Sequence, residues 1–398
     1  MATLTGGNAV VEALKAEGVN HVFGLIGSAG MEVFDALYDA AEIRFISVRD
    51  ERTGLHMADG YARAAGRAGV FLAGQNGPGA TNTVTGLAQA YAAYSPVVCL
   101  AGSLSSAHVY RDAFQEVDQQ ALFKPITKKT WTVTRAARIP EMVGEAFRTA
   151  LAPRQGPVAL NLPRDLLAET IDVALPLRAA SADSRQTTPA GDPAAVRRCA
   201  MLLANAAKPL IIAGGGIKND RTHEPVLRLA EILHAPVVLS AGHGDAVPCT
   251  HPLYAGQVGP RGNVVASDMA READVILALG TRLGFNTTFY SYDNLNPAAK
   301  IIQVEIEPAA LGRFFPVEIA VHGDAGSVAA QLAEKLADHR AQAALAWEAD
   351  FRQKRQKLVA ERDAVGGRPA QPIQPAAVFK ALRDCVPDDA MFTMDAGT

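Results

Sequence analysis

Short runs of hydrophobic residues alternate with amphipathic segments over the first 175 residues of the chain. Residues 8–17 place Val10, Ala13 and Leu14 at helical spacing, and Gly18 suits the position directly after a helix end. The hydrophobic runs are too short for helices and do not alternate with polar residues, which is typical of parallel strands buried on both faces. We interpret residues 1–175 as a doubly wound parallel α/β domain. Its predicted strands are His21–Ile26, Phe45–Val48, Val70–Ala73, Val97–Ala101 and Val158–Asn161, with further helices at 51–65 and 80–93.

A stretch without periodicity separates this domain from the next. Residues 176–192 collect Pro, Ser, Thr and Gly, and we interpret them as a linker. A second, Rossmann-like α/β domain is predicted over residues 193–340, with a helix at 223–234. Its predicted strands are Leu210–Ala213, Val237–Ser240, Val275–Leu279 and Ile301–Glu305.

The residue pattern near the end of the chain predicts the beginning of a third unit. Residues 327–361 are helical and charged in pattern, and residues 341–374 are interpreted as a helical connection and linker. Residues 375–398 begin with a predicted helix at 375–384 and a strand at Met391–Met394. Since a strand that ends in Asp-x-Gly normally leads into a βα loop, we expect a third α/β domain that is truncated here.

Composition narrows the functional classes. The 398 residues carry a formal net charge of −3, which gives no basic surface for nucleic acid or anionic lipid. No hydrophobic run approaches the roughly 18 residues that span a bilayer, and the first residues lack the pattern of a signal peptide. The four cysteines form no CxxC pair, which disfavours zinc ribbons and disulfide frameworks. We therefore expect a cytoplasmic protein without nucleic-acid or membrane partners.

Glu51 is the first candidate for chemistry. It follows the predicted strand Phe45–Val48 and begins a predicted helix. Open α/β sheets bind ligands at the carboxyl ends of their strands, which favours a functional role. A carboxylate in the first turn is also a common response to the helix dipole, so both interpretations stay open from the residues alone.

Three loops with glycines follow predicted strands. Residues 75–82 (QNGPGATN) join a buried strand to a helix, and their glycines would let a ligand approach the backbone; an ordinary tight turn is the alternative. Residues 214–216 (GGG) lack the full GxGxxG spacing, so they are a weak dinucleotide signal. Arg282, after a third strand, could pair with a phosphate or cap the next element. The histidines show no spacing typical of metal ligands.

Several segments match one known family in order and spacing. In the first domain they are His21-Val22-Phe23-Gly24, Glu51 with residues 56–66, residues 77–82, 112–116 and 124–128, and Gly156-Pro157-Val158 with residues 161–163. In the second domain they are residues 214–216, 235–237, 273–282 and 299–301. The chain thus resembles the thiamine diphosphate-dependent enzymes of the acetolactate synthase-like family over nearly its whole length.

The resemblance implies that the first domain binds the aminopyrimidine ring of thiamine diphosphate. The residue that matches Glu51 hydrogen-bonds the ring nitrogen N1′ and promotes the tautomer that activates the cofactor for attack on a 2-oxo acid or similar carbonyl. Gln115 matches a catalytic glutamine near the substrate. The other cofactor-binding positions implied by the match are Gly27, Ser28, Gln75, Asn76, Pro78, Gly79 and Asn82.

In this family the diphosphate and Mg²⁺ are held by a third domain, through Gly-Asp-Gly and a later pair of asparagines. Neither motif occurs in this sequence, so we expect no metal ligand in this chain and interpret it as part of a longer enzyme. The family's active sites form between subunits. The resemblance therefore implies a homodimer or homotetramer that acts on a small-molecule substrate.

Flavin binding stays open at this point. Acetolactate synthases hold FAD in their central domain without redox chemistry, whereas related decarboxylases leave the same domain without a flavin. The positions that match a flavin or nucleotide pocket are Gly214, Gly215, Gly216, Gly280, Thr281, Arg282 and Glu305.

Departures from the acetolactate synthase pattern point to a subgroup. Residues 26–28 (IGS), Asp50 and Gln75-Asn76 differ from the residues usual there, and residues 25–37, 45–51, 74–82 and 301–306 look more like sulfoacetaldehyde acetyltransferase. Two amides after a strand would offer donors to a sulfonate, or they could tie the turn to neighbouring backbone. Two other classes stay open: a flavin- or nicotinamide-dependent oxidoreductase, and a non-catalytic binding protein on the same fold.

Overall fold

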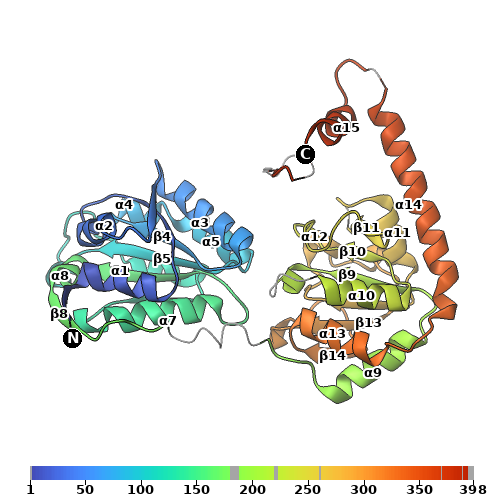
Figure 1. Cartoon of the computed structure of the whole chain (residues 1–398), viewed down its shortest axis with the longest axis horizontal. Helices are drawn as coiled ribbons and strands as arrows, with labels where there is room; N and C mark the ends of the chain where they lie inside the picture. Colours follow the sequence, from blue (N-terminus) through green and yellow to red (C-terminus); the bar gives the residue numbers. More distant parts are fainter. Residues whose placement is uncertain are drawn as a thin grey trace. The chain divides into compact units, whose positions relative to one another are not determined.

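The computed structural model describes residues 2–179, 188–218, 223–259, 261–368, 370–387 and 389–392. The chain divides into two compact units, Met1–Thr187 and Thr188–Thr398, and each is described by itself (Figure 1). Each unit is built on one six-stranded sheet in which every described pairing is parallel. The predicted parallel α/β class is therefore confirmed for both units.

The sheet of the first unit has the strand order β3-β2-β4-β5-β7-β6. Its strands are β2 (His21–Leu25), β3 (Arg44–Ser47), β4 (Gly69–Ala73), β5 (Val97–Ser103), β6 (Lys129–Thr132) and β7 (Val158–Pro163). A separate antiparallel pair joins β1 (Ala2–Thr5) to β8 (Thr170–Val173). The helices are α1 (Gly6–Ala16), α2 (Met31–Tyr38), α3 (Glu51–Ala65), α4 (Pro78–Thr81), α5 (Val84–Ala92), α6 (Gln119–Phe123), α7 (Ile139–Leu151) and α8 (Arg164–Ala168).

Both faces of this sheet are buried. Val70 and Leu72 of β4 belong to the core that includes α1, α2 and α7, whereas Phe71 and Ala73 belong to the core that includes α3 and α5. Alternate side chains of one strand thus enter opposite cores, which explains why the strand reads as an unbroken hydrophobic run. The sheet is doubly wound, as the sequence predicts.

Helix α1 ends where the sequence predicts. Gly18 has φ +74°, and its N–H donates to the carbonyl of Lys15 while the N–H of Val19 donates to the carbonyl of Leu14. This pair of hydrogen bonds is the Schellman motif, in which a glycine without a Cβ adopts the left-handed conformation at low cost.

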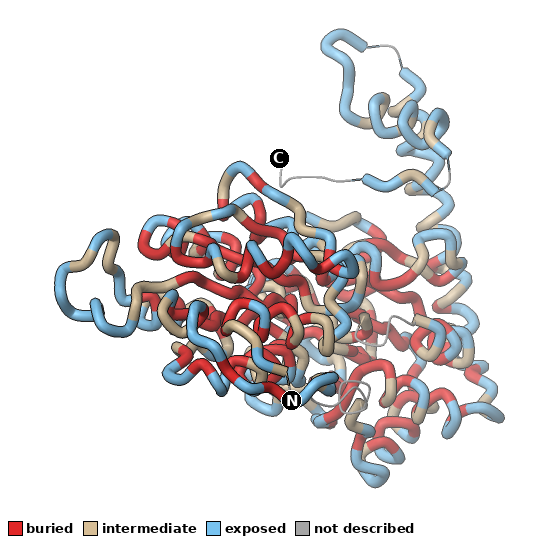
Figure 2. Tube along the Cα trace, turned by 60° about the vertical axis from the view of Figure 1, so that its left-hand side comes forward, coloured by how far each residue is buried: buried red, intermediate tan, exposed pale blue. Residues whose placement is uncertain are grey.

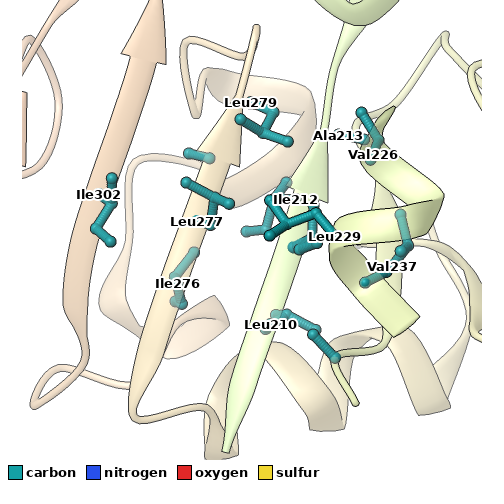
Figure 3. Packing of buried hydrophobic residues seen from close by; sticks show 14 of the residues in the cluster. Leu210, Ile212, Ala213, Val226, Leu229, Val237, Ile276, Leu277, Leu279 and Ile302 are labelled. Carbon is teal, nitrogen blue, oxygen red and sulfur yellow. The ribbon is translucent and has the colours of Figure 1, made fainter. Parts of the chain in front are cut away.

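The sheet of the second unit has the strand order β11-β10-β9-β12-β13-β14, the order of a doubly wound Rossmann-type sheet. Its strands are β9 (Pro209–Ala213), β10 (Val237–Leu239), β11 (Tyr254–Gln257), β12 (Val275–Leu279), β13 (Lys300–Glu305) and β14 (Ile319–His322). Its helices are α9 (Pro193–Ala204), α10 (Glu224–Leu233), α11 (Val264–Glu272), α12 (Phe285–Thr288), α13 (Ala325–Lys335), α14 (Leu345–Gly366) and α15 (Pro375–Cys385). In Figure 3, Leu210 and Ile212 of β9 pack between β12 and the α10 residues Val226 and Leu229.

Some predicted helices are divided in the structure. The helix predicted at 80–93 becomes α4 and α5, because the N–H and the hydroxyl of Thr83 both turn back to the carbonyl of Ala80. The segment 327–361 is divided into α13 and α14, with a short 3-10 turn at Gln342–Ala344 between them. Other 3-10 turns lie at Ser106–His108, Lys124–Ile126, Ala136–Arg138, Gly215–Lys218, Tyr292–Asn294 and Pro308–Ala310.

The end of the chain agrees only in part with the prediction. The helix predicted at 375–384 is α15, and Figure 2 shows α15 as exposed or intermediate along its length. Met391 and Phe392 are not in a strand, and the remainder of the strand predicted at Met391–Met394 lies outside the described residues. Within the linker predicted at 176–192, residues 180–187 also lie outside them, whereas Gly191 donates its N–H to Oε1 of Gln331 in α13. The predicted domain limits stay predictions.

Candidate functional site

The first unit has a topological switch point between β2 and β4. The chain passes from β2 to β3 on one side and then returns to β4 on the other side, so the loops that leave β2 and β4 diverge at the carboxyl edge of the sheet. Ser28 lies after β2 and Gln75 after β4. Both the N–H and the hydroxyl of Ser28 donate to Oε1 of Gln75, each over 2.9 Å. The sequence-predicted residues of these two loops therefore meet.

Glycines let the two loops touch backbone to backbone. A Cβ added at Gly27 would lie 2.5 Å from the carbonyl carbon of Gly74, and one added at Gly74 would lie 2.4 Å from the nitrogen of Gly27. Contacts this short exclude any side chain at either position unless the backbone moves. Gly27 thus allows close packing of the switch point, and its predicted role in cofactor binding stays a prediction.

Glu51 is the first residue of α3. The side chain of Asp50 caps this helix, because its carboxylate accepts from the N–H groups of Arg52 and Thr53. Glu51 itself is only 7% exposed, so its carboxylate needs partners among the surrounding polar groups. Asn82 supplies one of them: its Nδ2 donates to Oε2 of Glu51 over 3.0 Å.

A glycine lies in front of this carboxylate. A Cβ at Gly79 would lie 3.4 Å from Oε1 of Glu51 and 3.0 Å from the Cβ of Gln75. A side chain at position 79 would therefore crowd the space beside the carboxylate. Pro78 begins α4 and fixes the turn that carries Gly79 and Asn82. A buried carboxylate beside a residue without a side chain is compatible with a flat nitrogen heterocycle that donates to the acid.

The two amides at positions 75 and 76 are already engaged within the protein. Nε2 of Gln75 donates to Oδ1 of Asn76 and, over 2.7 Å, to Oε1 of Gln115. Nδ2 of Asn76 donates to the carbonyls of Phe114 and Gln115, over 3.0 and 3.1 Å. With two hydrogens on each amide nitrogen, all donors have a protein acceptor. This arrangement favours the interpretation in which the amides tie the turn to neighbouring chain, and not the one in which they present free donors to a sulfonate.

Gln115 is held in an unusual backbone conformation. Its φ is +59°, and a Cβ added at Gly77 would lie only 2.3 Å from its carbonyl oxygen. The preceding turn is closed by Glu116, which accepts from the N–H groups of Tyr110 and Ala113. These backbone hydrogen bonds lower the pKa of Glu116. The structure thus brings Gln115 to the same edge as Gln75 and Asn76. The sequence points to Gln115 only through the family resemblance.

Two buried polar residues support the site and were given no role from the sequence. Gln119 accepts from the N–H of Gly77 over 3.4 Å and donates to Oδ1 of Asn161 over 2.9 Å. Both residues are more than nine-tenths buried. Asn161 lies in a strand that is otherwise apolar, and a polar residue inside a buried strand is the signal that could have identified it.

The second unit has its own switch point, between β9 and β12. The N–H of Gly214 donates to Leu279 and the N–H of Gly216 donates to Gly280, which has φ +58°. A Cβ at Gly280 would lie 2.5 Å from the Cα of Gly216. These glycines therefore pack backbone against backbone, as Gly27 and Gly74 do in the first unit.

The other residues of the predicted nucleotide pocket lie at the same edge in different surroundings. The hydroxyl of Thr281 is buried and accepts from Ser240 over 3.1 Å, whereas Arg282 is exposed. Glu305 ends β13 and is 7% exposed, and its Oε1 accepts from the N–H of Ile306. A Cβ at Gly215 would meet the ring of His243 at 2.6 Å. The carboxyl ends of β9, β12 and β13 thus bring the predicted residues to one edge.

Two further findings concern metal ligands and membrane-spanning helices. Within the described ranges, no group of three or more His, Cys, Asp and Glu side chains could hold a metal ion. No helix in the described part of the chain is both long enough and apolar enough to cross a membrane.

Comparisons with known proteins match a separate family model to each of the two units. Residues 4–122 match the thiamine pyrophosphate enzyme N-terminal TPP binding domain, and residues 196–332 match the central domain of the same enzymes. The chain belongs to the thiamine diphosphate-dependent enzymes, in the family of acetolactate synthases and sulfoacetaldehyde acetyltransferases.

The relatives fall into both of these groups. A probable acetolactate synthase large subunit of Methanocaldococcus jannaschii is 39% identical over 327 residues, which are 82% of this chain and 55% of the relative. The sulfoacetaldehyde acetyltransferase of Alcaligenes xylosoxydans xylosoxydans is 39% identical over 337 residues, 84% of this chain and 55% of the relative. Acetolactate synthase isozyme 3 large subunit of Escherichia coli is 34% identical over 402 residues, 100% of this chain and 69% of the relative. The chain thus spans about half the length of the first two relatives.

Proposed function

We propose that this chain supplies the aminopyrimidine-binding site of a thiamine diphosphate-dependent enzyme that transfers an acyl unit from a 2-oxo acid or a sulfoacetaldehyde-like carbonyl compound. The observation that carries the proposal is the buried carboxylate of Glu51, which accepts a hydrogen bond from Asn82 and has Gly79, a residue without a side chain, beside its other oxygen. A carboxylate so placed can share a proton with a ring nitrogen in surroundings from which water is largely excluded.

In this proposal each residue has a limited task. Glu51 would hold N1′ of the aminopyrimidine, and Asn82 keeps the carboxylate oriented by donating to its second oxygen. Ser28 and Gln75 join the two loops of the switch point, and Gln115 lies beside them. When bound, the cofactor supplies the electron sink that stabilises a carbanion next to the former carbonyl carbon.

The first experiment concerns Glu51. In the full-length gene product with thiamine diphosphate and Mg²⁺, Glu51→Gln should lower turnover by about 10²–10⁴-fold, the usual contribution of a general acid–base group. Exchange of the cofactor C2 proton, followed by NMR in D₂O, should fall in parallel. A matched control is Glu12→Gln, which removes a carboxylate of α1 that pairs with Lys15. Exchange at the wild-type rate in the Glu51→Gln variant would reject the proposal.

The substrate is decided by a second experiment. The relatives divide between acetolactate synthases and sulfoacetaldehyde acetyltransferases, and the engaged amides of Gln75 and Asn76 favour neither. Pyruvate alone and sulfoacetaldehyde with phosphate are supplied separately, and acetolactate, sulfite and acetyl phosphate are measured. Sulfite with acetyl phosphate assigns the acetyltransferase reaction, and acetolactate assigns the synthase reaction. If neither product is formed, a non-catalytic role would be favoured.

The remaining assignments rest on the family. We propose Mg²⁺ as the companion of the cofactor diphosphate, a homodimer or homotetramer with sites between subunits, and a cytoplasmic location. Flavin at Gly214, Gly280 and Arg282 is a separate prediction, which visible absorbance of the purified protein tests directly. Hydride transfer to that flavin or to a nicotinamide would instead favour an oxidoreductase.

A further inference from the structure

The amino-terminal edge of the first sheet carries a pair of cations that the proposed function does not use. Lys128 lies just before β6, and Arg154 lies between α7 and β7. Because β6 and β7 are parallel neighbours, the segments that precede them lie at the same edge. The candidate site follows β2, β3 and β4, so it lies at the opposite edge of the sheet.

The side chain of Lys128 is fixed by its surroundings. Its Nζ donates to the carbonyl of Ala152 over 2.8 Å, at the end of α7. Its aliphatic stem packs against Gly156, where an added Cβ would lie 3.0 Å from both Cγ and Cδ of the lysine. A lysine that packs its stem and directs its ammonium at one carbonyl has lost most of its rotamer freedom before any ligand binds.

Arg154 is fixed by an aromatic ring. Its guanidinium carbon lies 3.6 Å from the centre of the Tyr94 ring, a close cation–π contact. Tyr94 lies in the short loop between α5 and β5, so its ring belongs to the same edge of the sheet. A stacked guanidinium keeps its N–H donors in the plane of the group, where they can reach an oxyanion.

The two positive charges repel each other. Burial lowers the pKa of Lys128 to about 8, and the positive charge of Arg154 lowers it in the same direction. Within the described part of the chain, no carboxylate forms an ion pair with either side chain. The nearby Glu145 is already shared by Lys129 and Arg148. Lys128 contacts Ala152 and Gly156, which lie on either side of Arg154 in the chain. Two half-buried cations at one short loop without a carboxylate are electrostatically unfavourable unless an anion joins them.

We propose that Lys128 and Arg154 form a binding site for a small tetrahedral oxyanion, either free phosphate or the phosphate group of a small ester. An anion between them would accept from the ammonium and from the guanidinium, and would turn their mutual repulsion into two attractions. The site differs from the candidate active site in its edge of the sheet and in its residues. It therefore stands independently of the proposed function.

The test measures the chemical reactivity of the Lys128 amine. The full chain is pulsed with an isotope-coded acetylating reagent at pH 7.5, and the rate at each lysine is measured by mass spectrometry. Without phosphate, Lys128 should react faster than Lys129, which pairs with Glu145. Inorganic phosphate should slow Lys128 about tenfold, since one unit of pKa changes the neutral fraction tenfold. Chloride at equal ionic strength should have little effect, and Lys129 should respond to neither ion.

Variants and a second ligand complete the experiment. Arg154→Gln should abolish the protection of Lys128 by phosphate, whereas Lys129→Met should leave it unchanged. In calorimetry, Lys128→Met and Arg154→Gln should each weaken phosphate binding about tenfold or more, as expected for one charge-assisted hydrogen bond. Stronger protection by glycerol phosphate than by phosphate would assign an ester, and the reverse would assign the free ion. Equal reactivity of Lys128 in phosphate and in chloride would overturn the proposal.

Discussion

Asn82 donates from Nδ2 to Oε2 of Glu51 over 3.0 Å and so connects the turn after β4 to the first residue of α3. The two residues are 31 positions apart in the sequence, and each follows a different strand of the same sheet. The other carboxylate oxygen lies near Gly79, where an added Cβ would be 3.4 Å from it. The orientation of Glu51 therefore depends on a residue outside its own helix.

This relationship predicts a graded effect of substitutions at position 82. Asn82→Ala removes the donor and should lower kcat of the full-length gene product about tenfold or more, because hydrogen bonds to charged groups contribute most. Asn82→Asp places a second carboxylate against the first and should lower kcat further, because like charges repel. Steady-state kinetics with the substrate found above measure both. If the two variants kept wild-type kcat, Asn82 would have no positioning role.

Two glycines of α3 should respond to alanine in opposite directions. A Cβ at Gly54 would lie 2.4 Å from Cε2 of Phe71 and 2.9 Å from Cγ2 of Val48, so Gly54→Ala should cost about 1–3 kcal/mol through overpacking. Gly60 has nothing within 4 Å of its added Cβ, and Gly60→Ala should stabilise the helix by about 0.5–1 kcal/mol. Urea unfolding gives the free energy of each variant. The same sign for both would contradict the packing described for α3.

Asn76 should prove more important for the loop that contains Gln115 than for binding substrate. Asn76→Ala leaves the carbonyls of Phe114 and Gln115 without their donor, at a cost of about 1–3 kcal/mol. Asn76→Asp should lower stability further, because a carboxylate oxygen would then face the carbonyl oxygens of Phe114 and Gln115. Trypsin cleavage after Arg111 should be faster in both variants, and fastest in the Asp variant. Unchanged cleavage with impaired substrate binding would favour a direct role in recognition.

The four cysteines should differ in their rate of alkylation, two reacting in the folded chain and two only after unfolding. Cys99 is completely buried, and burial raises its pKa to about 12; burial also raises the pKa of Cys199 to about 11. Cys249 and Cys385 are exposed. N-ethylmaleimide at pH 7.5 should therefore modify Cys249 and Cys385 in the folded chain and all four in urea, as peptide mass spectrometry would show. Rapid labelling of Cys99 without denaturant would mean that the core beneath α3 and α5 opens.

Glu348 should link the stability of the second unit to acid pH. Burial raises its pKa, but hydrogen bonds with His234 of the α10 terminus and with Arg352 outweigh burial and hold the pKa below its usual value. A depressed carboxylate pKa stabilises the fold at neutral pH, and this stabilisation disappears as the pH falls through the folded-state value. The difference in unfolding free energy between wild type and Glu348→Gln should therefore shrink from pH 7 to about pH 3.5. A constant difference over this range would exclude the ionised carboxylate as its source.

The buried strands could be predicted from the sequence because burial on both faces leaves uninterrupted apolar runs such as 70–73 and 275–279. Strands β6 and β14 lie at sheet edges, have four residues each and are partly exposed, so their pattern does not differ from that of a loop. The division between α4 and α5 depends on one hydroxyl that returns to a carbonyl, and hydrophobic periodicity does not detect it.

The site residues could be named from the sequence, but their arrangement could not. The resemblance points to Glu51, Gln75, Asn76 and Gln115, yet it does not indicate that the amides of positions 75 and 76 donate to the loop at 114–115. Such contacts depend on the side-chain rotamers and on the left-handed backbone of Gln115, neither of which leaves a signal in residue spacing. Gln119 was missed for the same reason, whereas Asn161 did leave a signal, as a polar residue within an apolar strand.

The contact between Gly27 and Gly74 has a consequence for how this sequence can change over time. A side chain at one position collides with the backbone at the other, so no single substitution there is neutral unless a loop moves first. The two loops also share the bond from Ser28 to Gln75, so such a movement would disturb the neighbourhood of Glu51 as well. Replacement of either glycine therefore requires a shift of the loop backbone, and a side chain at either position in a related sequence would indicate that the switch point has been rebuilt.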